Sequence, residues 1–297
     1  MLNNVSDHED LDFDYSEITT KVQLVCLDIL REIHRVCVEN NIHYSLGAGT
    51  VIGFKLFGGY IPWDDDIDLL MVREDYEKFL RLFPEKCSSR YKLVYYRDGK
   101  EFNSLYAKVY DKNTTIVENP NGRYLKNGAF IDISVLDGVP NHIFHKRAIL
   151  KGKFAYSLLY RQCGLEAGDR WKQLIMKFIA NKFFFSIKEK IYRWYEDFCI
   201  SHGNRPYVKY AELMVKNFWS SLYDVDLFNE YVIVKFEGVE TYIIKDYDRF
   251  LIQKYNKKDF VRNQPREKRM PSHSIYFTDK IGYEEFDLKK FTNALQK

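Results

Sequence analysis

Apolar residues repeat at spacings of three and four near the start of the chain, across residues 16–40. They are Val22, Val25, Cys26, Ile29, Ile33, Val36 and Cys37. This spacing places one apolar face along a helix, and Asn40-Asn41 provides a stop. A second helix is predicted from residue 73 to about 83, where Pro84 limits it because proline lacks the backbone N–H of a helix interior.

Shorter apolar runs predict strands in the middle of the chain and a hairpin closer to its end. The strands are expected at 91–96, 105–110, 116–117 and 129–136, and the hairpin at 232–244 turns at Gly238. A short helix at 246–255 follows the hairpin. Between these parts, residues 145–202 have helical spacing and many aromatic side chains among lysines, which predicts two or three helices packed on the sheet.

The stretch 46–71 combines a glycine-rich turn with four carboxylates. Gly47-Ala48-Gly49-Thr50 precedes a helix-like segment, and Asp64, Asp65, Asp66 and Asp68 come just before an apolar strand. Residues two apart on a strand face the same side, so Asp66 and Asp68 present adjacent carboxylates. Such carboxylates repel each other unless a cation lies between them, and their oxygens suit Mg²⁺ or Mn²⁺. A solvated acidic turn is the alternative interpretation.

Two further features indicate phosphate chemistry. Glycines let backbone N–H groups approach a phosphate, and a following helix N-terminus favours negative charge, so Gly47, Gly49 and Thr50 are candidate phosphate contacts. Asp132 lies in the middle of an apolar strand, where a carboxylate needs a partner. That partner is either a metal shared with Asp66 and Asp68 or a group such as Lys108.

Composition narrows the class of protein. Lysine and arginine total 45 against 42 aspartates and glutamates, so no overall charge favours nucleic acid. Five cysteines without paired spacing favour a reducing compartment over a zinc module or disulfide framework. The acidic start predicts no signal peptide, and no apolar run is long enough for a membrane span. We therefore expect a cytoplasmic protein that binds no nucleic acid.

The stretches Gly-x-Gly-Thr-x-x-Gly and Gly-Tyr-Ile-Pro-Trp-Asp-Asp-Asp-Ile-Asp resemble the LicD family, whose relatives include fukutin-type proteins. The resemblance continues at residues 130–140, at Phe236-Glu237-Gly238 and at 245–248, and then at Arg269 and His273. It spans residues 41–273. The family belongs to the nucleotidyltransferase-fold superfamily, so it implies an α/β (α+β) fold: a mixed sheet flanked by helices, with an added helical region.

The resemblance also implies an activity. LicD-like proteins transfer a phospho-substituent, typically phosphocholine, from a CDP-linked donor to a sugar hydroxyl and release CMP. The implied acceptors are cell-surface glycans such as teichoic acid, lipopolysaccharide or capsule precursors, lipid-linked at the membrane surface. Asp66, Asp68 and Asp132 are then the catalytic and metal-binding residues. Lys55, Lys108, Arg269 and His273 join the glycine turn as substrate contacts. Two residues after Lys108, where the family often has arginine, the chain has Tyr110, which indicates a different donor head group.

Three functions stay open at this stage. A phosphotransferase is favoured, with CDP-choline, CDP-ribitol or CDP-glycerol as donor. A nucleotidyltransferase that releases pyrophosphate, and a non-catalytic protein of glycan assembly, are the alternatives. Lysines and aromatics of the helical region suit either a membrane face or an ordinary packed surface.

The expected organisation has four parts. They are an acidic leader (1–15), a catalytic core (16–140), a helical region packed on the core (141–230), and a C-terminal hairpin, short helix and basic tail that complete the same domain (231–297).

Overall fold

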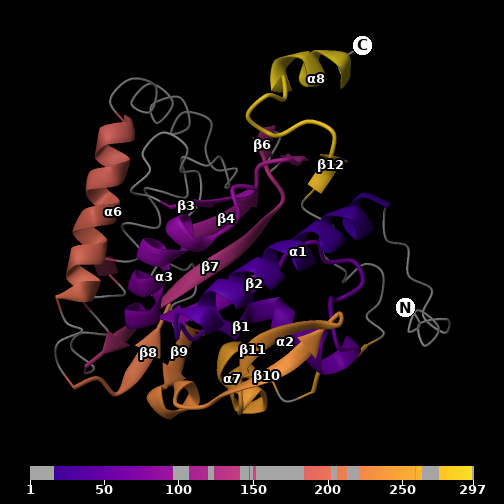
Figure 1. Ribbon diagram of the computed structural model, residues 1–297. Coiled ribbons are helices and arrows are strands. Elements are labelled where there is room, and N and C mark those ends of the chain that lie inside the picture. The colour runs from indigo at the N-terminus through magenta and orange to yellow at the C-terminus, as the bar shows by residue number, and fades with distance from the viewer. Residues whose placement is uncertain are drawn as a thin grey trace, which may run out of the picture.

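The computed structural model describes residues 17–95, 107–119, 124–140, 147, 150–151, 184–201, 206–212, 221–257, 259–262 and 274–295 (Figure 1). The expected acidic leader lies outside the described residues, as do most of 141–183. Within the described part, no helix is both long and apolar enough to cross a bilayer.

A mixed sheet forms the centre of the molecule, with strands in the order β1-β2-β7-β4-β3 (Figure 1). These strands are β1 (Ser45–Leu46), β2 (Asp68–Val72), β7 (Phe130–Val139), β4 (Ala107–Asp111) and β3 (Tyr91–Val94). β2 and β7 run parallel, whereas β1 pairs with β2, and β4 with β7 and β3, in antiparallel fashion. The later part of β7 pairs with β8 (Lys209–Ala211), which pairs with β9 (Leu222–Asp224).

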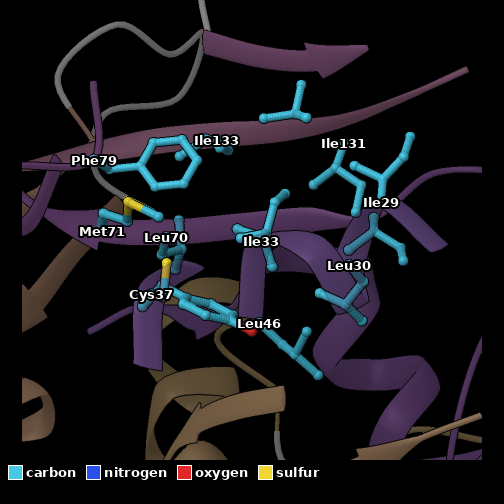
Figure 2. Close-up of a cluster of buried hydrophobic side chains, with 14 of the residues drawn as sticks. Ile29, Leu30, Ile33, Cys37, Leu46, Leu70, Met71, Phe79, Ile131 and Ile133 are labelled. Carbon is cyan, nitrogen blue, oxygen red and sulfur yellow. The ribbon is translucent and has the colours of Figure 1, made fainter. Parts of the chain in front are cut away.

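The hydrophobic core lies between this sheet and the helices packed against it. α1 (Glu17–Glu39) buries the apolar face that the sequence predicts, and α3 (Arg73–Lys86) adds Phe79 and Phe83. Figure 2 shows α1 side chains against those of the strands: Ile29, Leu30, Ile33 and Cys37 of α1 with Leu46, Leu70, Met71, Ile131 and Ile133. Burial of these side chains is the main stabilising term of the fold.

Two smaller sheets flank the central one. β10 (Tyr231–Phe236) and β11 (Val239–Ile244) form the expected hairpin, whose turn places Glu237 and Gly238 at positive φ. The hairpin joins the core, since the Ile244 N–H donates to the Ser45 hydroxyl at 3.0 Å. In the third sheet, β5 (Thr115–Glu118) lies between β12 (Ser274–Thr278) and β6 (Leu125–Asn127).

The remaining helices border the central sheet or follow it. α2 (Ala48–Phe57) connects β1 to the acidic loop, and α7 (Tyr247–Tyr255) follows the hairpin as expected. A 3₁₀ turn, η5 (Val225–Phe228), follows β9. α6 (Phe184–Ile200) packs on β7 through Tyr195, Cys199 and Val139, and α8 (Leu288–Leu295) follows β12.

The mixed sheet with flanking helices confirms the predicted fold class, and the expected strands are found as β3, β4, β5 and β7 with shifted ends. Two details differ. α3 continues past Pro84 to Lys86, because a proline so close to the end of a helix removes little of its hydrogen bonding. The region expected to be helical over 141–230 also contains β8 and β9, which are too short to show a period in the sequence.

Candidate active site

Asp68 and Asp132 lie opposite each other on the two parallel strands. Asp68 begins β2, and its register partner on β7 is Asp132. The Asp132 N–H donates to the Ile67 carbonyl at 3.0 Å, which continues the ladder toward Asp66. Partners in register on neighbouring strands project from the same face, so β2 and β7 bring together two carboxylates that are 64 positions apart in the sequence.

The carboxylates around this point crowd one another. Burial raises the pKa of Asp68 well above its usual range, and the nearby charges of Asp66 and Asp132 raise it further. Burial also raises the pKa of Asp64 to about 9, and Asp66 contributes both through its charge and through a hydrogen bond. Several carboxylates of intermediate exposure therefore lie close together, and a bound cation would reduce the repulsion between them.

Lys108 supplies one positive charge at this cluster. It is the register partner of Asp132 on the other side, and its Nζ lies 2.7 Å from Asp132 Oδ1. The same ammonium lies 3.3 Å from the centre of the Phe130 ring. The ion pair is close but poorly aligned, so Asp132 Oδ1 is buried without a hydrogen-bond donor. Lys108 is thus the alternative partner that the sequence allowed for Asp132.

A pocket of about 130 Å³ opens between these groups and the third sheet. Asp66, Asp132 and Lys108 line one part of it, and Glu118 of β5 lines another. Phe130, Ile116 and Val22 supply apolar wall. Asp65 also lines the pocket, and its Oδ2 accepts the Ser274 N–H at 3.0 Å, which attaches β12 to the acidic loop. Asp65 therefore orients the loop.

The glycine turn contacts the backbone of Asp68 on both sides. The Gly47 N–H donates to the Asp68 carbonyl at 2.8 Å, and the Asp68 N–H donates to the Thr50 hydroxyl at 2.9 Å. A Cβ on Gly49 would lie 3.5 Å from Asp64 Oδ2, so the turn lies beside the acidic loop. Gly47 and Thr50 thus position Asp68. Their contact with a donor phosphate stays a prediction, and so does that of Gly49.

The other predicted substrate contacts are placed differently. Lys55 is in the last turn of α2, and its Nζ donates to Asp248 at 2.6 Å. The N-terminus of α2 is the end beside the carboxylates, and Lys55 lies roughly 10 Å from that end along the helix axis. The structure therefore does not bring Lys55 to the carboxylate cluster. Arg269 and His273 lie outside the described residues.

Sequence reasoning missed a second charged group beside Asp68. Lys254 of α7 donates to Glu212 Oε1 at 2.6 Å, and the Tyr223 hydroxyl donates to the same oxygen at 2.7 Å. Both groups act on Asp68 through their charge: the carboxylate of Glu212 raises the pKa of Asp68, and the ammonium of Lys254 lowers it. The sequence signal was weak, because these residues are distant along the chain from the aspartate signature and belong to no motif.

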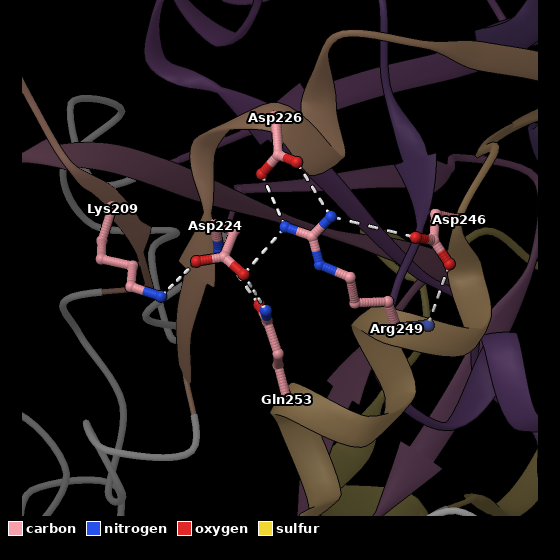
Figure 3. Close-up of polar contacts among 6 residues, drawn as sticks. All are labelled: Lys209, Asp224, Asp226, Asp246, Arg249 and Gln253. Carbon is pink, nitrogen blue, oxygen red and sulfur yellow. Dashed lines mark hydrogen bonds and ion pairs between the residues drawn. The ribbon is translucent and has the colours of Figure 1, made fainter.

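A network of ion pairs holds α7 in this position (Figure 3). Arg249 of α7 donates to Asp224 of β9 at 2.8 Å and to Asp226 of the 3₁₀ turn at 2.9 Å. Asp224 also accepts from Lys209 and Gln253. The network ties β8, β9 and α7 together, so Lys254, five residues after Arg249 on α7, is directed toward Glu212.

The donor set suits a divalent cation. Asp66, Asp68 and Asp132 offer hard oxygen ligands, their charges repel one another, and one buried oxygen of Asp132 has no hydrogen-bond donor. Among the described residues, however, no three histidine, cysteine, aspartate or glutamate side chains already converge in metal-binding geometry. The residues fit a metal chemically, with Lys108 as the cation now in contact with Asp132.

Comparisons with known proteins agree with this site. The family model for the LicD/FKTN/FKRP nucleotidyltransferase domain matches residues 41–150, which include Asp66, Asp68, Lys108 and Asp132. The lipopolysaccharide cholinephosphotransferase LicD of Haemophilus influenzae is 30% identical over 259 residues, which cover 84% of this chain and 94% of that relative. The uncharacterized protein RP689 of Rickettsia prowazekii is 24% identical over 128 residues, 43% of this chain and 45% of its own. On the extent of these matches, the chain belongs to the LicD family.

Proposed function

We propose that this protein is a metal-dependent phosphotransferase that moves phosphocholine from CDP-choline to a sugar hydroxyl of a cell-surface glycan and releases CMP. The observation that carries the proposal is the register of Asp68 with Asp132 on adjacent parallel strands, beside Asp66. The relative named as a lipopolysaccharide cholinephosphotransferase supports the head group and the class of acceptor.

In this proposal, Asp66, Asp68 and Asp132 hold Mg²⁺ or Mn²⁺. When bound, the ion neutralises charge that develops on the transferring phosphoryl group. Gly47 and Thr50 hold the Asp68 backbone, so its carboxylate keeps a fixed direction. Lys108 lies at the cluster, where it pairs with Asp132, and in this proposal it contacts a phosphate oxygen of the donor.

The reaction itself is a displacement at phosphorus. The oxygen of the acceptor hydroxyl forms a bond to the phosphorus of the choline phosphate, and the bond from that phosphorus to the CMP oxygen breaks. A carboxylate must accept the hydroxyl proton, and we assign this role to Asp132, whose buried Oδ1 has no hydrogen-bond donor. CMP leaves with the electron pair of the broken bond.

We further propose that the acceptor is lipid-linked and that the protein acts at the inner face of the membrane. The glycan acceptor in the name of the Haemophilus relative supports this view.

The test is release of CMP from defined donors. Purified protein with Mg²⁺ or Mn²⁺ is incubated separately with CDP-choline, CDP-ribitol, CDP-glycerol and CTP, beside an Asp66→Ala/Asp68→Ala variant. We expect CMP from CDP-choline, even as slow hydrolysis without acceptor, and none from the variant. Pyrophosphate from CTP alone would instead indicate nucleotidyl transfer. CMP from CDP-ribitol or CDP-glycerol alone would keep the reaction and change its head group.

A further inference from the structure

The turn of the β10–β11 hairpin carries a residue that does not suit its backbone conformation. Its two central residues, Glu237 and Gly238, have positive φ angles of 49° and 77°, and Phe236 pairs directly with Val239 across the turn. Two-residue turns with positive φ at both positions favour Asn-Gly, Asp-Gly or Gly-Gly. A glutamate here is therefore unfavourable for the hairpin itself, and the proposed reaction gives it no role.

Glu237 contacts, at two points, the turn that leads from α2 into the acidic loop. Its N–H donates to the Gly58 carbonyl at 3.1 Å, and its Oε1 accepts a hydrogen bond from the Tyr60 N–H at 3.1 Å. Gly59, between them, is buried, and a Cβ on it would lie 1.8 Å from the same Oε1. The absence of a side chain on Gly59 thus leaves the space that the Glu237 carboxylate occupies.

Tyr60 is connected in turn to the acidic loop by way of α1. The Tyr60 ring is buried against Phe236, with ring centres 5.1 Å apart, and its hydroxyl donates to the Gln23 carbonyl at 3.1 Å. The Gln23 side-chain amide donates to the Asp64 carbonyl at 2.7 Å. Because Asp64 stands two positions before Asp66, this series of contacts holds the backbone that carries a proposed metal ligand.

The segment held in this way has no helix or strand of its own. Between the end of α2 and the start of β2, residues 58–67 have an irregular backbone. A cation binds best to carboxylates whose directions are fixed, and the groups that orient metal ligands contribute to metal affinity. Contacts that fix residues 58–67 therefore affect the site without touching the cation.

From these contacts we infer that Glu237 is a positioning residue of the active site. Its N–H and its carboxylate hold residues 58–60, and through Tyr60 and Gln23 they fix the backbone that carries Asp66. The inference deepens the proposed function and rests on it for its bearing on the reaction. It also explains why a glutamate occupies a turn that favours asparagine, aspartate or glycine.

The experiment compares variants of the full-length protein that keep or remove the Glu237 acceptor. Glu237→Gly removes the side chain and suits the positive φ, so the hairpin keeps its turn, whereas Glu237→Gln keeps an oxygen for the Tyr60 N–H. Gly59→Ala is a second variant, because its Cβ displaces the carboxylate while Glu237 is retained. Asn41→Gly, at an exposed residue with a φ of 51°, is the matched control.

Hydrogen exchange followed by mass spectrometry measures the opening of residues 58–67 and, separately, of the hairpin at 231–244. Without metal or donor, residues 58–67 should exchange about tenfold faster in Glu237→Gly and in Gly59→Ala, with the hairpin unchanged. Glu237→Gln and Asn41→Gly should exchange like the wild type. Unchanged exchange of residues 58–67 in Glu237→Gly, or equal acceleration in these residues and in the hairpin, would overturn the inference.

Titration with Mn²⁺ alone measures the effect of Glu237 on the proposed metal site. The Kd for Mn²⁺ should rise about tenfold in Glu237→Gly and stay at the wild-type value in Glu237→Gln. Faster exchange of residues 58–67 with an unchanged Kd would overturn the positioning role.

CMP release in the same samples separates this inference from the proposed function. If the wild type releases CMP, and Glu237→Gly matches it in hydrogen exchange and in Mn²⁺ affinity, the transferase stands and the positioning role is removed. If the wild type releases no CMP from any donor, the transferase is contradicted. Faster exchange of residues 58–67 and weaker Mn²⁺ binding in Glu237→Gly would still support the positioning role in that case.

Discussion

The hydroxyl oxygen of Thr50 accepts a hydrogen bond from the backbone N–H of Asp68 at 2.9 Å. Thr50 is in the first turn of α2 and is buried, and Asp68 is the first residue of β2. With the Gly47 N–H on the Asp68 carbonyl, this bond fixes the backbone of an aspartate in the centre of the carboxylate cluster. The glycine turn thus has a positioning role besides any contact with phosphate.

Thr50→Val tests this role, because valine keeps the shape and removes the acceptor. The Asp68 N–H then has no partner in a buried place, which should cost about 1–3 kcal/mol of unfolding free energy. We also expect kcat for CMP release to fall with little change in KM. Thr50→Ser keeps the hydroxyl and should retain most of the stability and activity. Similar losses in both variants would show that packing matters at this position and the hydrogen bond does not.

Two glycines of the signature are expected to respond differently to alanine. A Cβ on Gly53 would lie 2.5 Å from the Gly59 carbonyl oxygen and 2.8 Å from the Ile61 nitrogen, so the backbone of the turn must shift. A Cβ on Gly49 would meet Asp64 Oδ2 alone, at 3.5 Å. Thermal unfolding should show Gly53→Ala with a clearly lower Tm. Gly49→Ala should have an unchanged or higher Tm, since alanine is favoured over glycine in a helix by about 1 kcal/mol. If Gly53→Ala unfolds at the wild-type temperature, the close approach of α2 to this turn is wrong.

Glu196 gives a prediction for stability against pH. Burial raises the pKa of Glu196 from 4.5 to about 6, although the Arg73 guanidinium, 3.0 Å away, acts in the opposite direction. The folded state therefore holds the proton more tightly than the unfolded state. The stability from this group is present below pH 4.5 and is lost as the pH rises through about 6. The loss is about 2 kcal/mol.

Urea unfolding of the wild type and of Glu196→Gln at several pH values measures this effect. The difference in unfolding free energy, wild type minus variant, should fall by about 2 kcal/mol between pH 4 and pH 7. Glu85→Gln, at an exposed position of α3, serves as the control and should show no such trend. A difference that stays constant over this range would contradict the assigned pKa.

Metal binding can be measured without any donor. Mg²⁺ or Mn²⁺ should raise the Tm of the wild type, because a ligand at 100 times its Kd stabilises the folded state by about 2.7 kcal/mol. Asp68→Asn and Asp132→Asn should lose most of this shift. Without metal, Asp68→Asn should unfold no lower than the wild type because one of several neighbouring like charges is removed, whereas Asp132→Asn also loses the ion pair with Lys108. Asp279→Asn, on the surface, should keep the shift. An equal shift in all four proteins would locate the metal elsewhere.

The sequence predicted the centre of the site because its parts are local or repeat a short pattern. Asp66 and Asp68 stand two apart before an apolar run, and Asp132 is a charge inside an apolar strand. The register of Asp68 with Asp132 depends on strand pairing, and only the structure gives it. The same holds for Lys254 and Glu212, which reach Asp68 from α7 and from the end of β8.

The sequence did not reveal features of the structure that depend on contacts between residues far apart along the chain, or on very short strands. Lys55 forms an ion pair with Asp248, which lies 193 positions later, and nothing in the sequence indicated this pairing. Glu118 carried no local signal, and it faces the pocket because β5 pairs with β12 and β6. Strands of three residues, such as β8 and β9, have no readable period and were assigned to a helical region.

The central claim is that the carboxylates joined by β2 and β7 carry phosphoryl transfer, and Asp132→Asn tests it most directly. The measurement is the initial rate of CMP formation from CDP-choline with Mg²⁺ or Mn²⁺, for the wild type, Asp132→Asn and the surface control Asp279→Asn. We predict that Asp132→Asn folds normally and loses activity by about 100-fold or more, whereas Asp279→Asn keeps the wild-type rate. Wild-type rates in a folded Asp132→Asn would contradict the account.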